Sequence, residues 1–190
     1  MGTIKTTNIE PIADNGTVTL GSSGDTFTVP SGVTVNMSSA TQTGVGGTNT
    51  PSFHVTQSAS QNFSSGTTTK ITYDTELYDV GSGFNTSNNN FTVPSGEAGK
   101  YFFYAQTQGL FSDSGTHFCN ISTYVNDTQT KYTRHNREGV STDTAFFHTS
   151  VVNLSVGDVV DIRLYHGYGS TRGNDNDAKV TYFLGYKLIG

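Results

Sequence analysis

Short stretches of alternating apolar and polar residues, separated by polar segments, recur along the chain. Such alternation places the apolar side chains on one face of a β-strand. The Gly, Pro, Asn and Ser residues between the stretches favour turns. From residue 51 onward, strands are predicted at 52–55, 69–73, 90–93, 100–106, 119–125, 144–154, 159–165 and 178–189. This number and spacing of strands is typical of a β-sandwich or jelly roll, so the predicted fold class is all-β.

The first 50 residues have a different texture. Short alternating runs at 17–20, 26–29 and 33–36 predict short strands, with Gly, Ser and Pro turns between them. Each run has too few apolar side chains to offset the entropy of ordering the backbone. The Gly-rich stretch 41–50 is typical of a linker. We therefore predict an anchor or stalk at 1–50, which borrows a core by trimerisation or by docking, and a head at 51–190.

One hexapeptide occurs twice. Residues 27–32 and 91–96 both read Phe-Thr-Val-Pro-Ser-Gly. Proline has no N–H for a strand ladder, and glycine tolerates a positive φ, so each copy predicts a strand that ends in a turn.

Two predicted strands are apolar on both faces. In 100–105, Tyr101 and Phe103 alternate with Phe102 and Tyr104, and 182–189 repeats this pattern. A sandwich strand in a monomer buries one face and exposes the other, so a second apolar face indicates a second partner. Closed symmetric association would cover it, and loops over a mixed sheet are the alternative. The residues predicted at a trimer interface are Phe102, Tyr104, Tyr182 and Tyr186.

Charge and composition exclude several classes of partner. The chain has a net charge of −5, so it lacks the broad basic surface that duplex nucleic acid requires. No apolar run is long enough to span a bilayer, and the N-terminal residues carry no signal pattern. We expect neither nucleic-acid binding nor membrane insertion, and synthesis in a cytoplasm. The single cysteine, Cys119, is expected to be a small core residue.

Two segments carry candidate binding chemistry. The basic cluster Lys131, Tyr132, Arg134 and Arg137 is predicted to be a ligand-binding loop for an acidic or glycan surface, with a solvated hairpin as the alternative. In the loop 173–177, Asp175 and Asp177 alternate with other polar residues and could hold Ca²⁺. That loop lacks the bidentate Glu of an EF-hand, which favours a solvated turn instead.

Catalytic patterns are missing from the sequence. The five histidines stand outside metal-binding motifs, and no paired carboxylates, nucleophile elbow or phosphate loop occurs. We therefore expect no enzymatic activity and no cofactor.

Several motifs in order resemble the C1q-like domain family. They are the segment 71–74 (Ile-Thr-Tyr-Asp), the Phe-Thr-x-Pro strand at 91–94, Gly-x-Tyr-x-Phe at 99–103, Leu-x-x-Gly-Asp-x-Val at 154–160 and Phe-x-Gly-x-x-Leu at 183–188. The resemblance covers about 51–190, although the four residues before Gly99 form a longer gap than usual. It implies a ten-stranded jelly roll that forms tight trimers, as in C1q and tumour-necrosis-factor-like heads.

The N-terminal segment 24–35 resembles repeat-like segments in fibre proteins of tailed bacteriophages. Together, the two resemblances imply a non-enzymatic, trimeric virion structural protein: a head fibre, a decoration protein or a short tail-fibre protein. It would be made in the host cytoplasm and attach to capsid or tail proteins through residues 1–40. A receptor-binding module for a host-surface glycan is the alternative. A glycan depolymerase is a remote one, because such enzymes are typically longer and carry acidic pairs.

Overall fold

The computed structural model describes residues 19, 22–35, 49–109, 113–140 and 143–188. Contacts between residues divide the chain into two units, Met1–Val45 and Gly46–Gly190.

The described part of the first unit, 22–35, contains no strand. The strands predicted at 26–29 and 33–36 are therefore not formed over the residues described there, and the run 17–20 lies outside the described residues except for Thr19. Phe27 and Val33 are largely exposed, because the segment pairs with no strand among the described residues and has little apolar surface to bury. The repeated hexapeptide nevertheless forms the same turn twice, with Gly32 at a φ of 84° and Gly96 at 80°.

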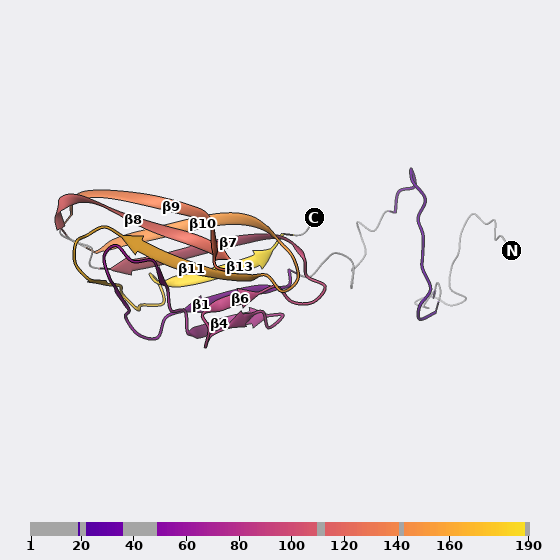
Figure 1. The fold of residues 1–190 in the computed structure, drawn as a ribbon. Helices are drawn as coiled ribbons and strands as arrows, with labels where there is room; N and C mark the ends of the chain where they lie inside the picture. Colours follow the sequence, from indigo (N-terminus) through magenta and orange to yellow (C-terminus); the bar gives the residue numbers. More distant parts are fainter. Residues whose placement is uncertain (1–18, 20–21, 36–48, 110–112, 141–142, 189–190) are drawn as a thin grey trace. The chain divides into compact units, whose positions relative to one another are not determined.

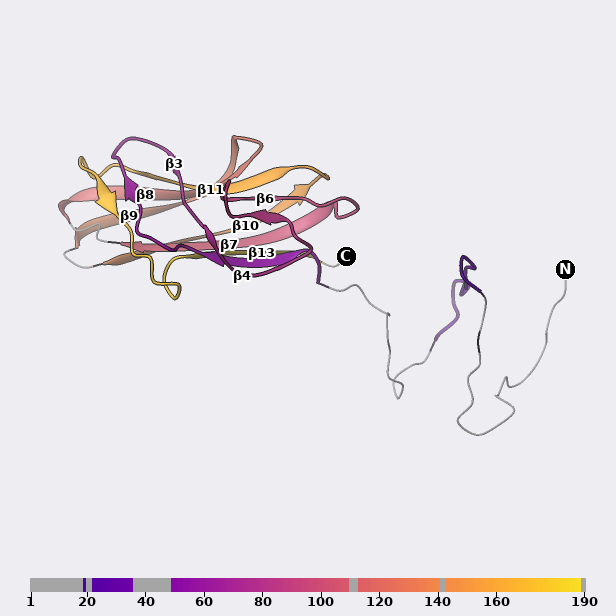
Figure 2. The ribbon, with the colours of Figure 1, turned by 90° about the horizontal axis from the view of Figure 1, so that it is seen from below.

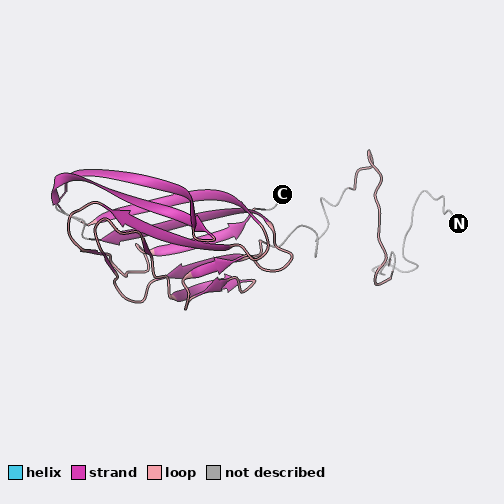
Figure 3. Cartoon of the chain, in the orientation of Figure 1, coloured by secondary structure: helices cyan, strands magenta, loops and turns pink. Residues whose placement is uncertain are grey.

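The second unit consists of strands, turns and loops, with no helix among its described residues (Figure 3). Within the described ranges, nothing helical is long and apolar enough to traverse a bilayer. The strands are β1 (Ser52–Thr56), β2 (Asn62–Phe63), β3 (Thr69–Lys70), β4 (Thr75–Val80), β5 (Phe84–Asn85), β6 (Asn90–Thr92), β7 (Gly99–Gly109), β8 (Asp113–Val125), β9 (Thr128–Val140), β10 (Thr144–Leu154), β11 (Val159–His166), β12 (Arg172–Gly173) and β13 (Tyr182–Lys187).

These strands form a sandwich of two antiparallel sheets (Figures 1 and 2). The five-stranded sheet has the order β10-β7-β13-β1-β4, and the six-stranded sheet has the order β5-β6-β11-β8-β9, with β3 also paired to β11. A small third sheet joins β2 to β12. Neighbouring strands are mostly distant in the sequence, which is the crossed connectivity of a jelly roll. The predicted all-β sandwich is confirmed.

The core lies between the sheets and is rich in aromatic rings. Phe53 is fully buried, with its ring centroid 5.0 Å from that of Phe84, 5.1 Å from Phe91 and 4.9 Å from Phe183. Gly185 leaves room for this cluster, because a Cβ there would lie 2.5 Å from the Phe103 ring. The alternate residues Tyr101 and Phe103 of β7 belong to this core.

Five strands were not predicted, namely the two-residue strands β2, β5 and β12 and the longer strands β4 and β9, and the predicted strands 69–73 and 178–189 are too long. The run 178–189 forms a strand only from Tyr182, because Val180 and Thr181 donate backbone hydrogen bonds to the Asp177 carbonyl and close a turn. β4 is an edge strand interrupted by a bulge. β9 is polar over most of its length and therefore shows no alternation. The sequence feature that marks the start of β9 is the turn Asn126-Asp127. These two residues have φ values of 49° and 62°, which is typical of a tight hairpin.

Candidate functional site

The outer face of the five-stranded sheet carries the four residues predicted at a trimer interface. Phe102 lies directly opposite Tyr186 across the β7–β13 ladder, with ring centroids 5.3 Å apart. Tyr104 stacks on Tyr182 at 5.6 Å. All four side chains are half-buried, and the alternate residues Tyr101 and Phe103 lie in the core. The structure thus brings these four residues together on one surface.

Two rows of directly opposed residues cross all five strands on this outer face. None of the ten carries a formal charge when the imidazole of His54 is neutral. The first row is Val151, Phe102, Tyr186, Ser52 and Val80. The second row is Thr149, Tyr104, Leu184, His54 and Tyr78. We call these ten residues the assembly face.

Two titratable side chains of the assembly face, His54 and Tyr104, have shifted pKa values. The ring of His54 meets those of Tyr78 and Tyr182 edge-on, with centroids 6.0 and 5.4 Å away. Its Nε2 is buried without a hydrogen-bond partner among the described residues, and burial lowers the pKa of the imidazole. Burial also raises the pKa of Tyr104 to about 12, and its hydroxyl donates to Gln106 Oε1 at 2.7 Å. Burial therefore favours the uncharged forms of His54 and Tyr104.

Exposed apolar side chains gather at both edges of the same sheet. Leu77, Tyr78 and Val80 on β4, with Phe147 and Val151 on β10, are each between 47% and 56% exposed. Between residues 49 and 188, the other exposed large apolar residues in the described part are Tyr132 and Val156. A group of exposed apolar residues on one sheet, unlike scattered single residues, is typical of interaction surfaces.

The basic cluster does not form a loop, which corrects the prediction made from its composition. Lys131, Tyr132, Arg134 and Arg137 all lie within β9, which pairs with β8 along its length. Because neighbouring positions in a strand face opposite sides, the cluster is divided. Tyr132 and Arg134 lie opposite Ser122 and Asn120 on the outer face. Lys131 and Arg137 belong to the other side, where Arg137 donates to the Thr144 hydroxyl.

The acidic loop forms a turn. The carboxylate of Asp175 accepts the Asp177 N–H at 3.0 Å, and the carboxylate of Asp177 accepts the Lys179 N–H at 2.9 Å. Among the described residues, no three His, Cys, Asp or Glu side chains gather as metal ligands would. The carboxylates thus close the turn themselves, and the preference for a solvated turn over calcium binding stays a prediction.

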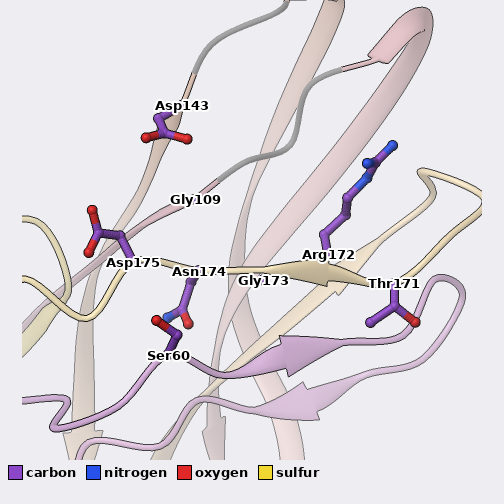
Figure 4. A pocket seen from close by; sticks show the side chains of 8 residues that line it. All are labelled: Ser60, Gly109, Asp143, Thr171, Arg172, Gly173, Asn174 and Asp175. Carbon is purple, nitrogen blue, oxygen red and sulfur yellow. The ribbon is translucent and has the colours of Figure 1, made fainter.

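A polar pocket of about 450 Å³ lies beside this turn (Figure 4). Its floor is fixed by Asn174, whose Oδ1 accepts the Gln61 N–H at 2.7 Å and whose Nδ2 donates to Gln57 and Thr107. Sequence reasoning missed this pocket, because its walls come from widely separated segments. Its lining consists of Ser60, Gly109, Asp143, Thr171, Arg172, Gly173, Asn174 and Asp175.

The histidines outside the assembly face make hydrogen bonds within the sandwich. His148 is buried, with Nε2 3.0 Å from the Thr123 hydroxyl and Nδ1 2.8 Å from the Thr133 hydroxyl. Its burial, together with the nearby His135, lowers its pKa to about 4. His166 Nε2 lies 2.9 Å from the Phe63 carbonyl. These contacts join strands to one another.

Comparison with known proteins identifies the fold. No family model matches the chain, and no curated protein matches it significantly. Among solved structures, the globular domain of zebrafish complement 1qA protein is 15% identical, with a TM-score of 0.50 over 73% of this chain and 98% of that one. Murine APRIL at pH 5.0 is 16% identical, with a TM-score of 0.54 over 73% and 98%.

A third similar structure is Eiger TNF from S. frugiperda, 15% identical, with a TM-score of 0.50 over 73% of this chain and 92% of that one. At such identities the likeness concerns the fold alone. The unit Gly46–Gly190 therefore has the all-β jelly-roll fold of the C1q and TNF structures.

Proposed function

We propose that the head assembles into a homotrimer through the assembly face. The observation that carries this proposal is the pair of uncharged rows that crosses all five strands of one sheet, together with the exposed apolar residues on both edge strands of that sheet. A head-to-tail interface joins two different surfaces of neighbouring copies and closes into a ring. The apolar outer face of this sheet and its apolar edge strands are different surfaces, so the face of one copy can pack against an edge of the next. The resemblance to C1q-like heads supports three copies.

We further propose that this trimer is a non-enzymatic structural protein of a tailed-phage virion, as a head fibre, a decoration protein or a short tail-fibre protein. The support is the resemblance of segment 24–35 to phage fibre proteins and the exposure of Phe27, Val33 and Val35 within that segment. A segment that buries none of its apolar side chains gains stability when a partner covers them. On this proposal, residues 1–40 attach the trimer to other virion proteins, and the protein is made in the host cytoplasm.

Native mass measurement of the full chain tests the trimer. Wild-type protein at micromolar concentration should give three chains, and Tyr104→Asp should give one, because a carboxylate would be desolvated in the interface. Tyr132→Asp is the matched control, since it makes the same change at an exposed tyrosine of the other sheet and should remain trimeric. A monomeric wild type would overturn the proposal, and so would a folded Tyr104→Asp variant that stays trimeric.

Deletion of residues 1–40 tests the virion role separately. The truncated chain should remain a soluble trimer and no longer join particles. Incorporation of the truncated chain at normal copy number would show that attachment runs through the jelly roll itself, and the role of the N-terminal segment would be abandoned.

A further inference from the structure

The outer face of the six-stranded sheet carries a second group of ordered side chains. Strands β9, β8 and β11 lie side by side there, so that Arg134, Asn120 and Tyr165 are directly opposed in one cross-strand row. Phe118 lies two residues before Asn120 on the same side of β8 and stacks on Tyr165, with centroids 5.7 Å apart. Neighbouring strands thus build one continuous surface of flat side chains.

The guanidinium of Arg134 is held in one orientation on this surface. Its Cζ lies 4.3 Å from the centre of the Phe118 ring, and its Nε donates to Asn120 Oδ1 at 3.1 Å. The terminal nitrogens of Arg134 make no hydrogen bond or ion pair with any residue that the structure describes. A planar guanidinium fixed by its Nε and by one face presents the remaining N–H groups as a fork, which suits the two oxygens of a carboxylate.

The neighbouring cations of this sheet already have partners. Arg163 donates from Nε to Asp161 Oδ1 at 2.6 Å, and its guanidinium also packs over Tyr124. Lys70 Nζ lies 2.9 Å from Asp161 Oδ2. Arg134 therefore differs from Arg163 and Lys70 in having an uncompensated positive charge among the described residues of this face.

A sugar ring has complementary groups beside Arg134. Tyr132 lies two residues before Arg134 on the same side of β9, and its side chain is 56% exposed. An exposed aromatic ring offers an apolar plane on which the C–H face of a sugar can pack. With Oδ1 of Asn120 engaged by Arg134, its Nδ2 is still a donor for a sugar hydroxyl.

We propose that this patch, formed by Phe118, Asn120, Tyr132, Arg134 and Tyr165, binds a uronic acid unit of an acidic polysaccharide. The carboxylate pairs with the Arg134 fork, and the sugar ring packs on Tyr132. The net charge of −5 means that the protein as a whole does not attract polyanions. Binding must therefore come from local geometry. The patch lies on the sheet opposite the assembly face, so this inference does not depend on the trimer.

Calorimetric titration of the full chain with trigalacturonate tests the proposal. Maltotriose is the neutral sugar control, and triglutamate supplies carboxylates without sugar rings. Trigalacturonate should bind saturably, maltotriose should not bind detectably, and triglutamate should bind at least about tenfold more weakly. If trigalacturonate does not bind, or if triglutamate binds equally well, the proposal is wrong.

Two variants separate the fixed fork from charge alone. Arg134→Lys keeps the charge but loses the planar fork, and should weaken trigalacturonate binding by at least about tenfold. Lys131→Gln is the matched control, because it removes an exposed cation from the other side of the same strand, and should change binding less than about threefold. Tyr132→Ser provides an independent test at an exposed site and should also weaken binding. Equal losses in Arg134→Lys and Lys131→Gln would show diffuse electrostatics and overturn the site.

Discussion

Acid should destabilise the sandwich through His148, and replacing this residue should remove that part of the effect. His148 is 2% exposed, and both of its ring nitrogens lie within hydrogen-bond distance of threonine hydroxyls, at 3.0 Å from Thr123 and 2.8 Å from Thr133. Burial and the nearby His135 hold its pKa at about 4, against 6.5 for an exposed histidine. His148→Gln keeps an amide that can donate and accept but removes the titration.

The sign and size of the effect follow from the two pKa values. As the pH falls below about 6.5, the unfolded chain takes up a proton at His148 while the folded chain does not, so stability falls. The loss continues down to the folded pKa of about 4 and then stops for this group. With about 1.4 kcal/mol per pH unit, we expect a loss of roughly 2 kcal/mol in unfolding free energy between about pH 7 and about pH 4.5.

Urea denaturation at about pH 7 and about pH 4.5 measures this loss of unfolding free energy. Protein concentration must be equal in all samples, because assembly also contributes to apparent stability. Burial also lowers the pKa values of His54 and His166, so the unfolding free energy of the wild type should fall by more than the roughly 2 kcal/mol that His148 contributes. The unfolding free energy of His148→Gln should fall by roughly 2 kcal/mol less than that of the wild type. Equal losses in the two proteins would refute the reasoning. If the variant does not fold, an NMR titration of wild-type His148 with a midpoint above about 6 would refute it equally.

Three further predictions concern the core, the thiol and the acidic loop. Gly185→Ala would place a Cβ 2.5 Å from the Phe103 ring and 2.8 Å from the Phe53 ring, so denaturation should show a loss of about 1–3 kcal/mol, and an unchanged midpoint would contradict this packing. Cys119 is fully buried and its pKa is raised by that burial, so thiol reagents should modify it only after unfolding, and rapid labelling of the native protein would disprove this. The carboxylates of loop 173–177 close their own turn, so chelators should leave the melting temperature unchanged, and a drop would reveal a bound divalent cation.

Alternation predicts the inward face of a strand well, because burial between the sheets selects apolar residues at every second position. In β7 and β13, this selection buries Phe103 and Phe183. The same rule fails for β9, whose inward-side residues Thr133 and His135 contact polar groups of β10. A strand whose inward side chains contact polar groups shows no alternation of apolar residues, so only the hairpin turn before β9 could have identified this strand.

Binding surfaces are harder to predict because they depend on which strands lie side by side. The contact between Phe102 and Tyr186 joins residues far apart in the chain and requires the β7–β13 pairing. The sequence groups Arg134 with Arg137, whereas the structure separates them and joins Arg134 to Phe118 and Tyr165 through two other strands. A cluster in sequence is therefore no guide to a cluster on a sheet.

The outer faces of the two sheets differ in what burial would cost, and this difference supports our proposal that assembly uses the five-stranded sheet. On the six-stranded sheet, Asp161 pairs with Lys70 and Arg163, and covering this network would strip water from its charges without adding partners. On the five-stranded sheet, the rows through Phe102 and Tyr104 carry no formal charge, so covering them gains apolar burial at little electrostatic cost. A second copy of the chain is therefore better accommodated on the five-stranded sheet. On this proposal the charged sheet stays exposed to solvent, where the guanidinium of Arg134 is accessible to a ligand.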